Sequence, residues 1–120
     1  MSTVKISGHW GEALAADYLR ARRYEIVDCN YHSRFGEIDL IARNRRYIAF
    51  VEVKARRDDV FAQAREFVTT RKQERIRASA EIWLENHPTE LQPRFDVIEI
   101  VAPYGPNGES SLVHLENAFE

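Results

Sequence analysis

Alternating apolar and polar residues predict two neighbouring strands in the middle of the chain. Residues 35–42 (FGEIDLIA) alternate as a half-buried strand does, and residues 47–54 (YIAFVEVK) form an apolar run rich in β-branched and aromatic residues. Such a run is typical of a central strand that is covered on both faces. Because only the polar turn at 43–46 separates the two segments, we expect them to form an antiparallel hairpin.

Apolar residues at helical spacing predict two helices, over residues 8–23 and 69–86. The first carries Trp10 on its apolar stripe and the second carries Trp83, so we expect both tryptophans to lie in the core. A threonine at 69 or 70 can cap the second helix.

Three further strands are predicted at 25–30, 94–101 and 112–115, whereas the pattern over 57–67 supports no assignment. The order of elements is therefore α-β-β-β-α-β-β. The connection from the third strand through the second helix to the fourth strand is long enough for a crossover, which makes those two strands parallel. The predicted fold class is α/β, a small mixed sheet with a helix on each side, in one domain over residues 1–120.

The composition is that of an ordinary globular domain. The 120 residues include 17 Lys and Arg against 19 Asp and Glu, and the formal net charge is -2. The single cysteine, Cys29, excludes an internal disulfide and a cysteine-rich zinc site. No segment is apolar enough to cross a membrane, and residues 1–10 lack the apolar stretch of a secretory signal, so we expect a cytoplasmic protein.

The small net charge hides an uneven distribution. Residues 1–80 hold 16 basic and 11 acidic side chains, whereas residues 81–120 hold 1 basic and 8 acidic side chains. Most of the basic residues are arginine, which pairs well with planar anions and phosphates. The pattern fits either a solvated, ion-paired surface or a face that binds a polyanion.

The most informative constellation is Asp39 followed by Glu52 and Lys54. Because side chains alternate along a strand, Glu52 and Lys54 share a face with Phe50, and that face becomes ionic at its end. The hairpin brings Asp39 near Glu52 or within one diagonal of it. The bland alternative is an ordinary cross-strand ion pair of the lysine with a neighbouring carboxylate. Glu37, on the face of Asp39, could be a further ligand or the partner of an arginine.

A divalent cation between these carboxylates would suit phosphodiester hydrolysis. Converging carboxylates repel each other unless a cation lies between them, and Mg²⁺ prefers oxygen ligands. Bound Mg²⁺ or Mn²⁺ activates water and neutralises charge on a phosphodiester, and Lys54 could orient that water. The sequence lacks the histidine spacing of zinc hydrolases and the glycine-rich loops of nucleotide-binding proteins.

Several sequence blocks, in order along nearly the whole chain, resemble the small bacterial YraN family. The blocks are residues 11–13 (GEA), 36–42 (GEIDLIA), 50–56 (FVEVKAR), Lys72 with Arg75 and Ile76, 94–97 (RFDV) and 117–119 (NAF). That family is similar to archaeal Holliday-junction resolvases and to the PD-(D/E)xK nuclease superfamily. The resemblance implies a restriction-endonuclease-like mixed sheet flanked by helices, which agrees with the predicted order.

The resemblance also implies roles for individual residues. Asp39 matches the motif aspartate, Glu52 the second acid and Lys54 the motif lysine, while Ile38 stands where the motif's name has proline. Glu12 resembles the helix glutamate that completes the Mg²⁺ or Mn²⁺ site in the resolvase-like branch, although it could simply favour the positive end of its helix.

Basic and polar residues near this site are the candidates for binding nucleic acid, with DNA favoured over RNA. They are Arg34, Arg56, Lys72, Gln73 and Arg75. An exposed helix start explains Lys72 and Gln73 equally well.

Three functions follow from these observations. The first is a metal-dependent nuclease that acts on DNA, including branched DNA, and a symmetric cut of a four-way junction would call for a homodimer. The second is a nucleic-acid-binding domain of the same fold that does not cut. The third is a structural or protein-interaction domain in which the ionic cluster is an ion-pair network.

Overall fold

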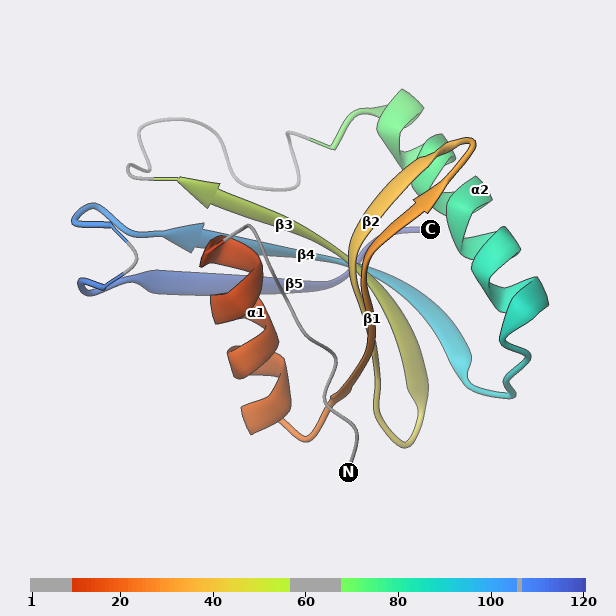
Figure 1. The fold of residues 1–120 in the computed structure, drawn as a ribbon, viewed down its shortest axis with the longest axis horizontal. Helices are drawn as coiled ribbons and strands as arrows, with labels where there is room; N and C mark the ends of the chain where they lie inside the picture. The colour runs from red at the N-terminus through yellow and green to blue at the C-terminus, as the bar shows by residue number, and fades with distance from the viewer. Residues whose placement is uncertain (1–9, 57–67, 106) are drawn as a thin grey trace.

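The computed structural model describes residues 10–56, 68–105 and 107–120, and its elements follow the predicted order (Figure 1). Within these ranges the helices and strands are α1 (Trp10–Ala21), β1 (Glu25–Ser33), β2 (Gly36–Arg43), β3 (Tyr47–Arg56), α2 (Thr70–Asn86), β4 (Gln92–Val101) and β5 (Ser111–Phe119). The α-β-β-β-α-β-β order is therefore confirmed. The predicted helix start at residue 8 and the unassigned segment 57–67 lie outside the described residues.

The sheet has the strand order β1-β2-β3-β4-β5. β2 and β3 pair antiparallel, as the predicted hairpin, and β4 and β5 also pair antiparallel. β3 and β4 pair parallel from Tyr47 and Gln92 to Arg56 and Val101, as a crossover through α2 requires. β3 therefore lies in the centre of the sheet, which confirms the interpretation of its apolar run.

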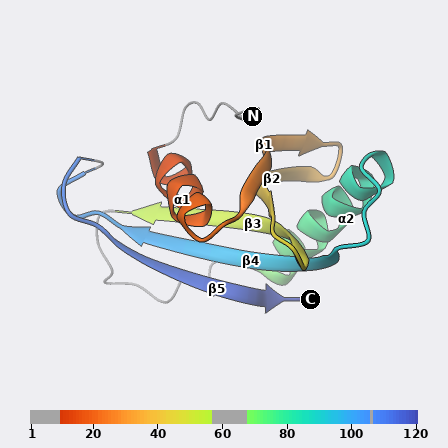
Figure 2. The same ribbon diagram turned by 90° about the horizontal axis from the view of Figure 1, so that it is seen from below.

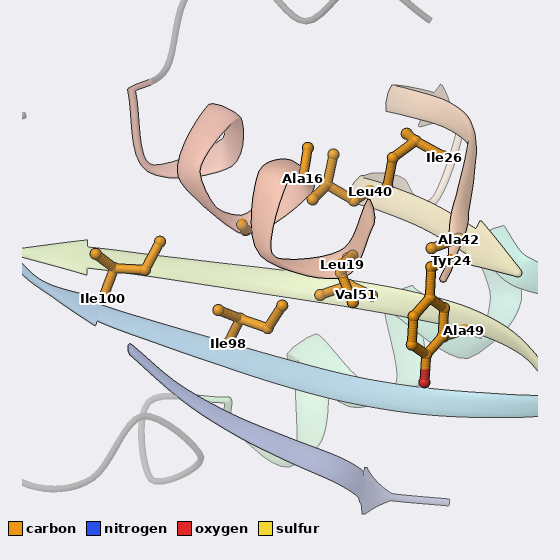
Figure 3. Close-up of a cluster of buried hydrophobic side chains, with 11 residues drawn as sticks. Ala16, Leu19, Tyr24, Ile26, Leu40, Ala42, Ala49, Val51, Ile98 and Ile100 are labelled. Carbon is orange, nitrogen blue, oxygen red and sulfur yellow. The ribbon is translucent and has the colours of Figure 1, made fainter. Parts of the chain in front are cut away.

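The two helices cover opposite faces of this sheet, and Figure 2 shows α1 lying over β3 and β4. On the α1 face, Leu19 packs in a cluster with Val51 of β3 and Ile98 of β4 (Figure 3). On the α2 face, Trp83 stands edge-on to Phe50 of β3, with ring centroids 5.9 Å apart. The face of β3 that carries Phe50, and with it Glu52 and Lys54 by alternation, is thus the α2 face.

The α1 helix departs from its prediction in two respects. Its last residue is Ala21, two residues before the predicted end, because Arg23 adopts a φ of 70°, a left-handed conformation that a helix cannot continue. Trp10 is only half-buried at the edge of the α1 cluster, whereas Trp83 is buried as predicted. Within the described ranges, neither helix combines the length and the apolar character that a membrane crossing requires.

Four strands are longer than predicted. β3 ends at Arg56 instead of residue 54 and β4 begins at Gln92 instead of residue 94, while β1 and β5 extend furthest. β1 continues past residue 30 to Ser33, where it still pairs with Gly36 of β2, and β5 continues past residue 115 to Phe119, which pairs with Phe95. Neither extension has a regular apolar alternation, so the hydrogen bonds of the partner strand decide its conformation.

The fully buried carboxylate of Asp96, on β4, links this strand to β5 by side-chain hydrogen bonds. Arg94 donates two hydrogen bonds to the carboxylate at 2.9 and 2.8 Å, the Nε2 atom of His114 lies at 2.8 Å, and the backbone N–H of Asn117 donates at 2.9 Å. Burial alone would raise the pKa of Asp96, but the hydrogen bonds from His114, Arg94 and Asn117 outweigh burial and lower it. Every group of this network that faces the carboxylate therefore stabilises its charged form.

The first turn of α1 approaches the end of β3 so closely that only glycine fits. A Cβ atom built on Gly11 would lie 2.4 Å from the Cβ of Ala55, far inside van der Waals contact. Gly11 therefore allows the adjacent Glu12 to come near the ionic end of β3.

We expect Gly11→Ala to destabilise the fold, although alanine is the better helix former by about 1 kcal/mol. The new methyl group would push α1 away from β3, at a cost of about 1 to 3 kcal/mol in unfolding free energy. Adding Ala55→Gly removes the opposing Cβ and should restore most of the loss in urea denaturation. If Gly11→Ala alone is as stable as the wild type, the close packing of α1 on β3 is contradicted.

Replacing Asp96 by Asn leaves the buried Arg94 opposite a neutral amide, and we expect a loss of about 3 kcal/mol in unfolding free energy at pH 7. Because the folded-state pKa of Asp96 lies below the unfolded value, its stabilisation is present above about pH 4 and is lost as the pH falls through the folded-state pKa. Urea titrations of both proteins at neutral and acid pH measure the difference, which should shrink on acidification. A difference independent of pH would argue against a stabilising carboxylate.

Candidate active site

The strands β2 and β3 separate at the position of Asp39 and Glu52. Their ladder ends at the pair Leu40 and Val51, although Asp39 and Glu52 would be the next pair in register. Beyond this point β2 stays paired with β1, and β3 stays paired with β4, so the β1–β2 hairpin turns away from β3 (Figure 1). The sheet therefore forks, and both inner edges of the fork begin with an acidic residue.

Where the ladder between β2 and β3 ends, the side chain of Asp39 takes over the hydrogen bonding to β3. Its Oδ2 accepts a hydrogen bond from the backbone N–H of Val53 at 2.8 Å, so a carboxylate replaces the strand partner. Asn30 of β1 stands opposite Asp39 and has a φ of 50°, a left-handed conformation that asparagine tolerates better than most residues. The hairpin twists here, because Leu40 packs in the α1 cluster whereas Ile38 packs in the α2 cluster.

Three carboxylates line one cavity of about 380 Å³ in the fork. Glu12 comes from α1, Asp39 from β2 and Glu52 from β3, so the structure brings the three predicted acids together. Glu37 lies at the rim, where its exposed side chain is 3.3 Å from the Nδ1 atom of His32. The other residues that line this cavity are Asn30, His32 and Val53.

The surroundings of Asp39 oppose its ionisation. Burial, reinforced by the charge of Glu52 and more weakly by that of Glu12, raises the pKa of Asp39 from 3.8 to about 7, against the opposing hydrogen bond from Val53. Glu12 is itself only 6% exposed although it lies in the first turn of a helix. An interaction with the helix end alone does not account for the position of Glu12 in a cavity shared with Asp39 and Glu52.

Two lysines balance the charge of Glu52. This carboxylate is 7% exposed, and its Oε1 lies 2.6 Å from the Nζ of Lys72 and 3.5 Å from the Nζ of Lys54. Burial and the neighbouring Lys72 lower the pKa of Lys54. Burial would lower the pKa of Lys72 as well, but its hydrogen bond to Glu52 outweighs burial and raises it. The closeness of Lys54 to Glu52 was predicted from the strand alternation, whereas the contact of Lys72 was not.

The donor set fits a hard divalent cation by its chemistry. Carboxylate oxygens are the ligands that Mg²⁺ and Mn²⁺ prefer, and a cation among Glu12, Asp39 and Glu52 would relieve the repulsion that raises the pKa of Asp39. As the side chains stand, no three Asp, Glu, His or Cys groups in the described part of the chain are close enough to hold an ion together. The ammonium group of Lys72 instead lies at Glu52, so binding a metal would require these side chains to rearrange.

A second cavity, of about 460 Å³, adjoins the first, since His32 and Glu37 line both. The start of α2 contributes Arg71, Lys72 and Arg75 to it. Ser33, Gly36, Thr69 and Ile76 complete its lining. Two of the predicted nucleic-acid contacts, Lys72 and Arg75, therefore border a basic cavity beside the carboxylates.

The other predicted contacts lie outside this group. Arg34 is exposed in the β1–β2 turn, with its guanidinium 4.9 Å from the ring centroid of Phe35. Arg56 pairs with Glu99 at 2.7 Å, and the side-chain amide of Gln73 donates to a backbone carbonyl just before α2 at 3.0 Å. A role of these three residues in binding stays a prediction.

Sequence reasoning missed Asn30 and the pairing of Lys72 with Glu52. A signal existed for Asn30, since an asparagine in a polar stretch of strand is a candidate for a left-handed backbone. No sequence signal reveals the contact of Lys72, because the crossover between β3 and α2 decides which residue of α2 reaches the fork.

The fold and the site define an α/β protein with a carboxylate and lysine site at the fork of a mixed sheet. The family model described as "Uncharacterised protein family UPF0102" matches residues 11–100. The chain is 41% identical to the UPF0102 protein of Syntrophomonas wolfei, over 93% of this chain and 96% of that protein. It is 46% identical to the UPF0102 protein of Acetivibrio thermocellus, over 80% of this chain and 75% of that protein. It is 43% identical to a UPF0102 protein of Rhodococcus jostii, over 93% of this chain and 94% of that protein.

The chain belongs to the UPF0102 family, and the resemblance to the YraN family is thereby confirmed. The names of these relatives state no activity, so the relation to nucleases stays a prediction.

We expect Asp39→Asn to stabilise the protein in EDTA above neutral pH, by on the order of 2 kcal/mol. The change removes a half-buried charge whose pKa is raised and keeps an acceptor for the N–H of Val53. The folded-state pKa of Asp39, about 7, is above the unfolded value. The wild type therefore loses stability, relative to the variant, as the pH rises from about 4 through the folded-state value. Thermal melting from acid to alkaline pH measures this difference. An equal difference at every pH would contradict the raised pKa.

Proposed function

We propose that this protein is a divalent-metal-dependent nuclease that hydrolyses phosphodiester bonds of DNA, including branched DNA. The observation that carries the proposal is the convergence of Glu12, Asp39 and Glu52 in one cavity, with Lys54 at the carboxylate of Glu52. Burial, together with the charges of the buried Glu52 and Glu12, raises the pKa of Asp39, and acids with raised pKa values in a cavity are a feature of functional sites. The adjoining basic cavity supports a substrate with negative charge.

Each residue of the fork has a role in this proposal. Glu12, Asp39 and Glu52 would hold Mg²⁺ or Mn²⁺, which supplies activation of water and neutralisation of charge on the phosphodiester. Lys54, whose pKa burial and Lys72 lower, would orient the attacking water or stabilise the charge that develops on the phosphoryl oxygens. The hydrogen bond from Val53 holds the carboxylate of Asp39 toward the fork.

The basic side chains at the start of α2 would contact the DNA backbone. Contacts from Arg71, Lys72 and Arg75 to phosphates carry no sequence information, so binding would depend on salt and on the shape of the DNA. The preference for DNA over RNA, the homodimer that a symmetric cut requires and the cytoplasmic location stay predictions.

The second candidate is a DNA-binding domain of the same fold that does not cut. The ion pair of Lys72 with Glu52 favours it, because an ammonium group there already neutralises a carboxylate that the nuclease would use for metal. This candidate predicts salt-dependent binding of DNA without turnover in the presence of Mg²⁺ or Mn²⁺.

We expect the purified protein to cleave labelled four-way junction, flap or linear DNA with Mg²⁺ or Mn²⁺ but not with EDTA. Glu52→Gln and Asp39→Asn should each lower the rate by about 100-fold or more, because each removes a carboxylate from the metal site. Lys54→Met should lower the rate without weakening the Mn²⁺ binding that calorimetry measures, because Lys54 is not a metal ligand.

Glu25→Gln is the matched control, since Glu25 forms an exposed ion pair with Arg43 that involves no residue of the cavity. Its rate should equal that of the wild type. Cleavage by Glu52→Gln at the wild-type rate would refute the assignment, and tight binding without cleavage by the wild type would favour the second candidate.

A further inference from the structure

One oxygen of Glu52 faces two ammonium groups, and the closer of them is not the one on its own strand. Lys72 reaches it from the first turn of α2 at 2.6 Å, whereas Lys54, two residues along β3, is 3.5 Å away. Thr69 caps the helix by accepting a hydrogen bond from the backbone N–H of Lys72 at 3.2 Å. The cap fixes the backbone from which this lysine reaches into the fork.

Lys72 takes the place that a metal ion would take at this carboxylate. A buried carboxylate needs a counter-charge, and Lys54 and Lys72 supply it in the structure as described. Adding a divalent cation to a cavity that already holds both ammonium groups would create a surplus of positive charge. Either the metal is excluded or one of the lysines leaves Glu52.

Lys72 is the lysine that is placed to leave. Its side chain is 38% exposed, against 30% for Lys54, and it lines the basic cavity as well as contacting Glu52. A lysine in the first turn of a helix also lies at the positive end of the helix dipole, where a cation is disfavoured without a nearby anion. Only Glu52 compensates for this position among the ion pairs of the described residues.

The adjoining cavity offers this ammonium group a second anionic partner once a substrate is present. Arg71 and Arg75 line the same space, and neither forms an ion pair with a carboxylate among the described residues. A phosphodiester placed there would meet cationic side chains from one and a half turns of α2. Its negative charge would draw Lys72 away from Glu52.

We propose that Lys72 is an exchangeable cation: it neutralises Glu52 in the metal-free protein and moves to a substrate phosphodiester when a divalent cation binds at Asp39 and Glu52. This inference rests on the proposed metal site and assigns Lys72 a positioning role there, in addition to the backbone contact predicted from the sequence. By linkage, a phosphodiester that takes Lys72 frees Glu52 for metal, so DNA and metal strengthen each other's binding to the same degree.

Calorimetric titration of Mn²⁺ into the DNA-free protein tests the exchange without any cleavage. Lys72→Met removes the competing cation and should raise Mn²⁺ affinity about tenfold. Arg77→Met is the matched control, because it removes a cation of the same helix that lines neither cavity and instead contacts the backbone oxygen of Glu120. Its affinity should stay within about twofold of the wild type. An unchanged or weaker affinity in Lys72→Met would overturn the proposal.

A measurement on the wild-type chain covers the case in which Lys72→Met fails to fold. Acylation by an amine-reactive ester, read by peptide mass spectrometry, reports how accessible the amine of Lys72 is. Mg²⁺ should increase the labelling of Lys72 severalfold relative to Lys54, since the ion pair with Glu52 is broken. Labelling of Lys72 that does not respond to Mg²⁺, while calorimetry detects bound metal, would overturn the exchange.

The coupling to DNA separates this inference from the proposed function. In Ca²⁺, a junction DNA should bind the wild type about tenfold more tightly than in EDTA. This gain should be lost in Lys72→Met but kept in Arg77→Met. If the exchange holds and no DNA is ever cut, the nuclease proposal fails alone. If DNA is cut and the affinity of Lys72→Met for Mn²⁺ is unchanged, the exchange fails alone.

Discussion

The separation of β2 from β3 at Asp39 and Glu52 is the constraint on which the site depends. A continuous ladder would pair these residues directly and direct both backbones into ordinary strand hydrogen bonds. Instead, the carboxylate of Asp39 accepts the N–H of Val53, so that a side chain replaces a strand at the edge of β3. The backbone N–H of Val53 therefore keeps a hydrogen-bond partner at the fork, and a polar cavity still remains at the end of the central strand.

Asp39 and Asp96 have carboxylates in very different surroundings, since Asp96 is fully buried and Asp39 is half-buried. Asp96 receives hydrogen bonds from Arg94, His114 and a backbone amide, and its pKa is lowered. Asp39 receives one backbone hydrogen bond beside two other acids, and its pKa rises to about 7. The surroundings of Asp96 stabilise its charged form and thereby the fold, whereas the surroundings of Asp39 disfavour its charged form unless a cation lies nearby. This electrostatic difference is the reason that the fork, and not Asp96, is the candidate functional site.

The two helices supply the site from opposite faces of the sheet. The absence of a side chain at Gly11 lets α1 approach β3 and brings Glu12 into the cavity. On the other face, the Thr69 cap starts α2 where Lys72 can reach Glu52. An acidic group from one helix and a basic group from the other thus meet at the end of β3.

The sequence by itself determined the order of elements, the central place of β3 and the common face of Glu52 and Lys54. These features follow from periodicity within single segments, and the short turn between β2 and β3 was enough to bring Asp39 close to Glu52. The family blocks around these residues added Glu12 to the site, which no periodicity within α1 could have done.

The tertiary structure alone decided where the hairpin leaves the sheet, how far β1 and β5 extend and which cations reach the carboxylates. The contact of His114 with Asp96 and the pairing of Lys72 with Glu52 join segments that are far apart along the chain. Such contacts depend on strand register and on the crossover that sets α2 against the sheet. The energies of these contacts come from burial and from charged groups that lie close together only in the folded protein. A local sequence pattern predicts neither the burial nor the charge pairs.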